Sequence, residues 1–102
     1  MATKPKFRLL RFGKPPTPQC THLDQIQEVS PSGQGCLECL QTGDEWVHLR
    51  LCLICGHVGC CDESKNKHAT QHYHSTGHPL IKSFEPGEDW MYCYVDRLTL
   101  NV

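Results

Sequence analysis

The stretch Cys52-Leu-Ile-Cys-Gly-His-Val-Gly-Cys60 and the histidine-rich run that follows it, His68 to His78, decide the fold of this chain. Within these 27 residues the sequence places four cysteines and five histidines: Cys52, Cys55, Cys60, Cys61, His57, His68, His72, His74 and His78. A hydrophobic core does not require so many Cys and His side chains, whereas zinc binds four of them in a tetrahedron. The stretch therefore predicts structural zinc, and more than one ion.

Length and composition set the class of protein. The chain has 102 residues, which suits one small domain whose thin core needs staples of metal or disulfide. Residues 1–12 lack the continuous apolar segment of a signal peptide, and no stretch reaches the ~18 apolar residues of a membrane span. We therefore expect a cytoplasmic protein without membrane contact. In that reducing compartment the eight cysteines indicate metal binding rather than disulfides.

Charge and proline divide the chain into a basic arm, residues 1–19, and an acidic folded domain, residues 20–102. Half of the ten basic residues precede Pro15, and no acidic residue does. From Pro15 onward five basic residues stand against eleven acidic ones, a balance of −6. An acidic body disfavours nucleic acid as the main partner, although the arm could add electrostatic affinity for it.

Two Cys-x-x-Cys turns, Cys36–Cys39 and Cys52–Cys55, each place two thiolates where they can share one ion. Further on, His68 and His72 stand at i and i+4, which puts both on one face of a helix. A zinc protease of the H-E-x-x-H type needs a Glu directly after the first His, but Ala69 stands there. The general base of such an enzyme is missing, and we expect no enzyme.

The remaining pattern predicts the α+β class. Segments 46–52, 80–84 and 90–95 have the composition and alternation of strands, and about residues 64–75 form one main helix. We expect a small zinc-stapled domain in which a short antiparallel β-sheet packs against that helix.

The ligand motifs, taken in order, span residues 20 to about 96. They are Cys20-x-His22, Cys36-x-x-Cys39, Cys52-x-x-Cys55-Gly, Cys60, His68-x-x-x-His72, Gly77-His78-Pro79-Leu80 and Trp90. This series resembles the UBP-type zinc finger, a module attached to many ubiquitin-specific proteases, and in particular its small stand-alone bacterial members. The resemblance implies two interleaved zinc sites: Cys36, Cys39, Cys60 and His68 for the first, and Cys52, Cys55, His72 and His78 for the second.

A third zinc is where the sequence departs from the family pattern. Members with three ions close the Cys-x-His pair with a late Cys-x-x-Cys, of which only one cysteine remains here. The ligands left for this site are Cys20, His22 and Cys93, and a fourth could be Cys61, His57 or His74. If the fourth is missing, the three form a buried polar cluster without metal. We therefore expect two zinc ions, within a range of one to three.

The resemblance also implies where a peptide would bind. Members that bind ubiquitin hold its C-terminal tail among aromatic side chains, and an Arg holds the terminal carboxylate. The matching aromatic residues, which could equally be core packing, are Trp46, Trp90 and Tyr92. Asp62 stands in place of the Arg and would repel a carboxylate, so ubiquitin is not the expected partner.

The function expected from these residues is a non-catalytic zinc-binding module that presents a surface to an unidentified protein or peptide. Three alternatives stay open. The first is a reader of ubiquitin-like C-terminal tails, and the second is nucleic-acid binding through the basic arm. The third is a zinc or thiol enzyme that uses Cys20, His22 and Cys93, because a catalytic zinc needs an open coordination position.

Overall fold

The computed structural model describes residues 20–101, so the basic arm expected over residues 1–19 lies outside the described part. The elements, in chain order, are η1 (Leu23–Gln25), α1 (Leu37–Thr42), β2 (Leu49–Cys52), β3 (Val58–Cys60), α2 (His68–Thr76), β4 (Leu80–Ser83), β5 (Trp90–Cys93) and β6 (Leu98–Asn101). Within residues 20–101, no helix has both the length and the apolar character needed to cross a membrane.

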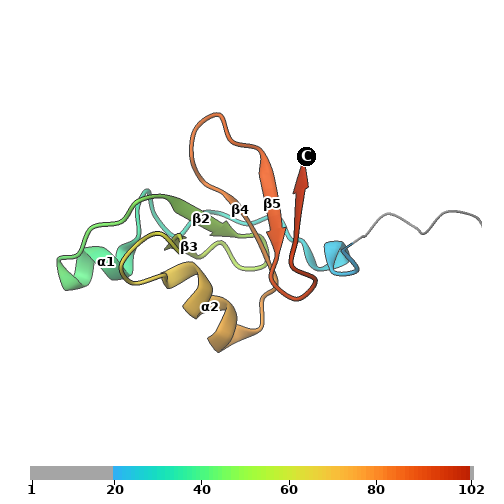
Figure 1. Cartoon of the computed structure of the whole chain (residues 1–102), viewed down its shortest axis with the longest axis horizontal. Coiled ribbons are helices and arrows are strands. Elements are labelled where there is room, and N and C mark those ends of the chain that lie inside the picture. Colours follow the sequence, from blue (N-terminus) through green and yellow to red (C-terminus); the bar gives the residue numbers. More distant parts are fainter. Residues whose placement is uncertain (1–19, 102) are drawn as a thin grey trace, which may run out of the picture.

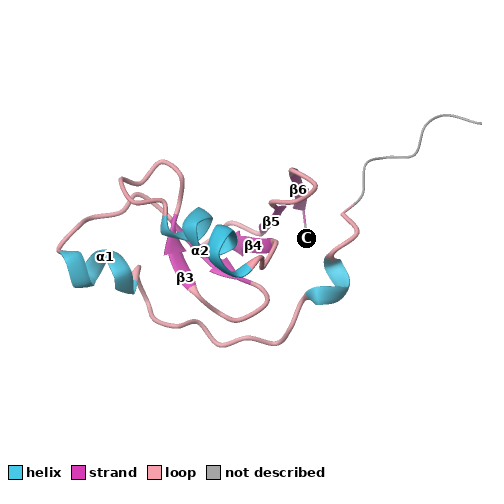
Figure 2. Cartoon of the chain, turned by 90° about the horizontal axis from the view of Figure 1, so that it is seen from below, coloured by secondary structure: helices cyan, strands magenta, loops and turns pink. Residues whose placement is uncertain are grey.

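The strands form one five-stranded sheet in the order β3-β2-β4-β5-β6, and each neighbouring pair is antiparallel. Helix α2 packs against β3 and β2, and it lies on one side of the sheet in Figure 1. The two short helices, η1 and α1, lie at opposite ends of the molecule (Figure 2). This arrangement confirms the predicted α+β class.

Strand β2 begins later than the predicted residue 46. Leu49 and Leu51 are buried while Arg50 between them is half-buried, which is the alternation expected of a strand with one covered face. Before His48 the backbone leaves the ladder, because the N–H of Val47 donates to the hydroxyl of Ser64 at 2.8 Å. The strand is therefore four residues long.

Helix α2 is also shorter than predicted at its start. It begins at His68 rather than near residue 64, because Lys67 has a left-handed backbone (φ 51°) that interrupts a helix. It ends where Gly77 takes the left-handed conformation and donates its N–H to the Tyr73 carbonyl oxygen at 2.8 Å, the usual C-terminal stop. His68 is consequently the first residue of the helix.

The core consists of two small clusters in which cysteines replace much of the usual aliphatic packing. One cluster contains Cys36, Cys39, Leu49, Leu51, Val58 and Cys60, and the other contains Cys20, Leu53, Leu80 and Cys93. Both clusters are small for a domain of this length, and half of their members are cysteines. The positions of these thiol groups therefore decide what else holds the fold together.

Candidate metal centres

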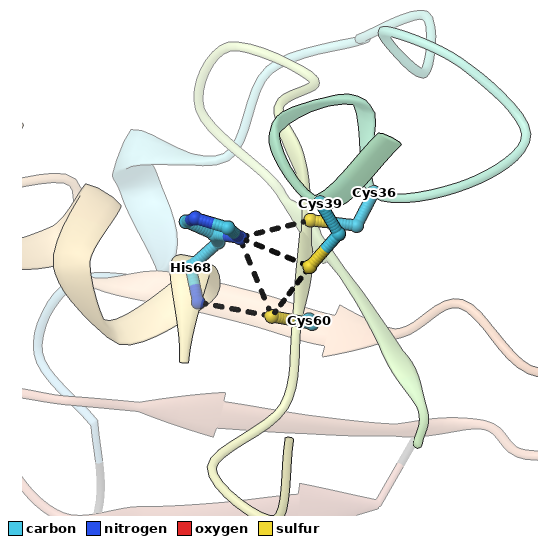
Figure 3. Close-up of side chains that lie close together, drawn as sticks. All are labelled: Cys36, Cys39, Cys60 and His68. Carbon is cyan, nitrogen blue, oxygen red and sulfur yellow. Dashed lines mark hydrogen bonds between the residues drawn. The ribbon is translucent and has the colours of Figure 1, made fainter. Parts of the chain in front are cut away.

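The first group, called site 1, is built from three elements. Cys36 immediately precedes α1, Cys39 lies inside it, Cys60 ends β3 and His68 begins α2. The Nδ1 atom of His68 lies 3.1 Å from Sγ of Cys36, 3.4 Å from Sγ of Cys39 and 3.5 Å from Sγ of Cys60. Figure 3 shows the four side chains pointing toward one common centre.

These distances fit a zinc ion. With Zn–S bonds of about 2.3 Å and Zn–N bonds of about 2.0 Å, a tetrahedron has edges of roughly 3.3–3.8 Å. The edge between the Sγ atoms of Cys39 and Cys60 measures 3.8 Å, and the three edges to His68 lie close to the same range. The donor set of three thiols and one imidazole is the kind that zinc prefers in structural sites.

Backbone and side-chain donors support the sulfur atoms of site 1. The N–H of His68 donates to Sγ of Cys60 at 3.2 Å, and Nδ2 of Asn66 donates to Sγ of Cys39 at 3.6 Å. Burial raises the pKa of the Cys36 thiol to about 12 when no cation is bound. A cation that binds here must therefore displace thiol protons, and the donated hydrogen bonds help to stabilise the resulting thiolates.

The second group, site 2, lies on the neighbouring side of α2. Sγ of Cys55 is 3.3 Å from Nε2 of His72, and Sγ of Cys52 is 3.7 Å from Nδ1 of His78, again within tetrahedral edge lengths. Burial lowers the pKa of His72, which keeps the imidazole in the neutral form that binds metal. Cys55 is exposed, so this site is closer to solvent than site 1.

A chain of side chains connects the two sites. The ring of His57 stacks on His72 with centroids 4.1 Å apart, and Nε2 of His57 lies 2.7 Å from Oε1 of Glu38. Glu38 stands between the two cysteines of the first turn, so His57 links a ligand of site 2 to the turn that carries two ligands of site 1. Such outer contacts fix the orientation of metal-binding histidines.

The turn after Cys55 requires glycine. Gly56 has φ 88° and donates its N–H to the Cys52 carbonyl oxygen at 2.9 Å. A Cβ at this position would collide with the Ser30 carbonyl oxygen, so an L side chain is excluded both by the backbone conformation and by the space. This turn places the thiols of Cys52 and Cys55 on one side of the loop.

The third group, site 3, differs from the sequence expectation in its fourth member. Cys20, His22 and Cys93 come together as expected, and Asp96 completes the group. Nδ1 of His22 lies 3.8 Å from Sγ of Cys20, 3.5 Å from Sγ of Cys93 and 3.0 Å from Oδ2 of Asp96. A hydrogen bond from the backbone N–H of Thr21, and then one with His22, lower the pKa of Asp96. A carboxylate is an accepted zinc ligand, so the group can form a closed set of four.

The three residues expected as a fourth ligand of site 3 lie in other surroundings. His57 contacts Glu38 and His72, Cys61 lies 3.5 Å from the Ser64 hydroxyl, and His74 is exposed on α2. The sequence does contain a signal for Asp96, because Cys93-x-x-Asp96 has the spacing of the late Cys-x-x-Cys with an oxygen ligand in the last position.

The family described as "Zn-finger in ubiquitin-hydrolases and other protein" matches residues 36–101, which contain all eight residues of sites 1 and 2. The chain belongs to the UBP-type zinc finger family. It is a zinc-binding domain of that family, and the number of ions is not determined by the match.

Relatives of this UBP-type zinc finger are much longer proteins. Ubiquitin carboxyl-terminal hydrolase 44 of Danio rerio is 31% identical over 90 residues, which cover 81% of this chain and 12% of that protein. BRCA1-associated protein of Homo sapiens is 30% identical over 96 residues, covering 91% of this chain and 15% of that protein. The chain therefore spans less than a sixth of the length of these relatives.

A solved structure of similar size also matches. The solution NMR structure of protein RPA1320 from Rhodopseudomonas palustris is 54% identical in sequence, has a TM-score of 0.76, and the match covers 83% of each chain. The fold of this chain therefore resembles that of a solved protein of similar length.

The three aromatic residues expected to bind a peptide differ in their surroundings. Trp46 packs against the core cluster of site 1 and lines a hollow with Leu40. Trp90 lies under the guanidinium of Arg50, 4.5 Å from the ring centroid, as a cation–π pair. Tyr92 contacts Tyr94 edge-on at 5.3 Å. The peptide-binding role of these three residues stays a prediction.

Asp62, which stands in place of the family's Arg, lies at a hollow on the surface. It lines this hollow with Arg50 and Tyr94, and its Oδ1 accepts a hydrogen bond from the hydroxyl of Thr70, which also lies 3.1 Å from the hydroxyl of Tyr94. The neighbouring Glu63 adds a second carboxylate to the lining. This hollow thus carries two acidic side chains and one basic one.

Proposed function

We propose that this UBP-type zinc finger is a non-catalytic interaction module whose zinc ions are structural. Sites 1 and 2 each offer four Cys or His donors, and a structural zinc uses four protein ligands whereas a catalytic zinc keeps one position open. Asp96 gives site 3 a fourth donor as well, which speaks against the open site that an enzyme built on Cys20, His22 and Cys93 would need.

One observation carries the interaction role. Helix α1 leaves Leu40 59% exposed, and this side chain lines a hollow of about 360 Å³ together with Asp44, Glu45 and Trp46. Leu37 on the same helix is 41% exposed, so the first Cys-x-x-Cys turn presents apolar groups to solvent. At the hollow itself the apolar groups are Leu40 and the half-buried Trp46, and an apolar hollow rimmed by polar residues supports a contact surface.

The charges at this hollow specify the partner further. Hydrogen bonds from Asn66 and Thr42, together with Lys65, lower the pKa of Asp44 to about 2, so this carboxylate is ionised at neutral pH. Glu45 is exposed beside it. The matching ligand is a protein or peptide segment with one large apolar side chain next to Lys or Arg, because opposite charges at an interface rim steer association.

A peptide array tests this proposal. The array pairs sequences that carry one large apolar residue beside Lys or Arg with the same sequences carrying Glu or Asp, and we expect only the basic series to bind. Calorimetric titration of the best peptide then compares the wild type with Leu40→Ser, for which we expect affinity to fall at least roughly 30-fold, the effect of losing a contact of about 2 kcal/mol.

The matched control is Val95→Ser, because Val95 is also half-exposed (50%) but lies outside this hollow. Equal affinities of Leu40→Ser and Val95→Ser would overturn the proposed surface. The absence of binding to any array peptide would overturn the interaction role itself.

Ubiquitin remains an unexpected partner. The hollow beside Arg50 contains Asp62 and Glu63, and their negative charges oppose a terminal carboxylate. We expect no saturable binding when a peptide ending in Gly-Gly with a free carboxylate is titrated into the protein. For nucleic acid we expect that deleting residues 1–16 abolishes whatever salt-dependent affinity the full chain has.

A further inference from the structure

A fourth group of potential metal ligands shares no residue with sites 1, 2 and 3, although Cys61 directly follows Cys60 of site 1. It contains His48, Cys61 and Glu63, whose Nδ1, Sγ and carboxylate oxygen atoms all lie within 4.8 Å of one another. We propose that these three residues form an additional, exchangeable site for a zinc-class divalent cation, with one coordination position open to the adjacent hollow. This proposal goes beyond the interaction role and does not depend on it.

The backbone holds two of the three ligands opposite each other. Strands β2 and β3 pair Leu49 with Cys60, and the ladder continues by one residue because the N–H of Cys61 donates to the His48 carbonyl oxygen at 2.9 Å. Directly opposed residues of an antiparallel pair project their side chains to the same face, about 4.5–5.5 Å apart at Cβ. His48 and Cys61 are thus placed together by the sheet itself.

The third ligand comes from a turn that is tied to the same strand. The N–H of Ser64 donates to the Cys61 carbonyl oxygen at 2.9 Å, and the Ser64 hydroxyl accepts the N–H of Val47 at 2.8 Å. These bonds bring Glu63 beside His48, with Oε1 3.8 Å from Nδ1. A tetrahedral zinc needs about 3.3 Å between these atoms, and Glu63, whose side chain is 78% exposed, can rotate to close the difference.

Burial and charge favour a cation at this position. Cys61 is buried, His48 is 43% exposed at the side chain, and Cys61 and Glu63 both line the hollow of about 200 Å³ that also contains Arg50 and Asp62. The two carboxylates outnumber the one guanidinium, and a bound cation would convert the thiol to a thiolate. Zinc sites that keep one position for water or an added ligand have three protein ligands, and here that fourth position would face the hollow.

The test is a metal titration of the full chain followed by native mass spectrometry, first with Zn²⁺ and then with Co²⁺ as a spectroscopic probe. We expect one ion more than the four-ligand sites 1, 2 and 3 hold. This ion should bind more weakly than the others, and a chelator should remove it first. Cys61→Ser and His48→Gln should each lower the affinity for that ion by at least roughly 10- to 100-fold. Loss of a residue that only hydrogen-bonds to a metal ligand already has an effect of this size, so loss of a ligand should cost at least as much. The ions of the closed sites should stay bound.

His74→Gln is the matched control, because His74 is an exposed histidine on α2 that belongs to none of the four groups. This variant should retain the additional ion. If no additional ion binds at about a 100-fold excess of metal, the proposal is overturned. It is overturned equally if an additional ion survives in both Cys61→Ser and His48→Gln. Since His48 is partly exposed, His48→Gln should fold and keep the test decisive even if Cys61→Ser does not.

Discussion

Gly59 of β3 packs closely against Ala69 of α2, and Gly59→Ala tests how this packing supports the metal. A Cβ on Gly59 would lie 2.6 Å from the backbone nitrogen of Ala69 and 2.9 Å from its Cα, where ordinary contacts begin at 3.4 Å. The helix would have to withdraw by about 0.8 Å, the difference between 2.6 and 3.4 Å. Gly59 and Ala69 are the immediate neighbours of Cys60 and His68.

A shift of this size is large compared with the tolerance of about 0.2 Å on a metal–ligand distance, so site 1 should lose affinity for zinc. Overpacking of this kind costs roughly 1–3 kcal/mol, which lowers the melting temperature by about 4–8 °C for each kcal/mol in a domain of this size. Thermal unfolding followed by circular dichroism measures the loss of stability. Competition with a chromophoric chelator measures the loss of zinc affinity, because the variant should release zinc at a lower chelator concentration than the wild type.

Gly87→Ala separates the clash from general glycine effects. A Cβ on Gly87 meets nothing within 4 Å, although its φ of 82° makes the alanine strained by about 1 kcal/mol. This control should lose some stability and keep the wild-type zinc affinity. If Gly59→Ala releases zinc at the wild-type chelator concentration and melts within a degree or two of the wild type, the reasoning is wrong.

Three further predictions follow from the other sites. Asp96→Asn should remove one zinc ion from the count in native mass spectra while Asp96→Cys retains it; an unchanged count in Asp96→Asn would exclude this ligand. Gly56→Ala should unfold the second Cys-x-x-Cys turn, because the added Cβ meets the Ser30 carbonyl oxygen. Unfolding followed by circular dichroism should show that the free energy of unfolding falls by several kcal/mol. Wild-type stability would show instead that the turn can adapt. Burial raises the pKa of the Cys36 thiol to about 12 without a cation, so zinc must displace its proton. Zinc affinity should therefore fall as pH falls, roughly tenfold per pH unit for each proton displaced. Chelator competition at several pH values measures this, and an affinity that does not change with pH would contradict it.

Much of the fold follows from the sequence because the ligand residues are themselves the core. The strand over residues 80–84 and the helix containing His68 and His72 are found within a few residues of their observed bounds. Both four-residue groups implied by the family resemblance come together in space, although each joins residues more than 25 positions apart. Spacing alone could not pair them, since either Cys-x-x-Cys turn can reach the histidines of α2.

What the sequence could not show depends on contacts between distant segments. The turn at Cys36–Cys39 continues into helix α1, whose exposed Leu40 creates the apolar hollow, and a turn motif does not specify that continuation. The group of His48 and Cys61 arises only from the register of β2 and β3. Lys67 carries a left-handed backbone conformation that a non-glycine residue rarely adopts, so the late start of α2 was not predictable from composition.

The interleaving of sites 1 and 2 along the chain has a consequence for synthesis on the ribosome. Site 1 can complete its tetrahedron only when His68, the first residue of α2, has left the exit tunnel, and site 2 only when His78 has followed. At about 5–20 residues per second the ten residues between them take roughly 0.5–2 s, and Asp96 follows after roughly 1–4 s more. The nascent chain therefore exposes up to seven reduced cysteines before the first site can close, and the ligand sets then become complete in the order of sites 1, 2 and 3.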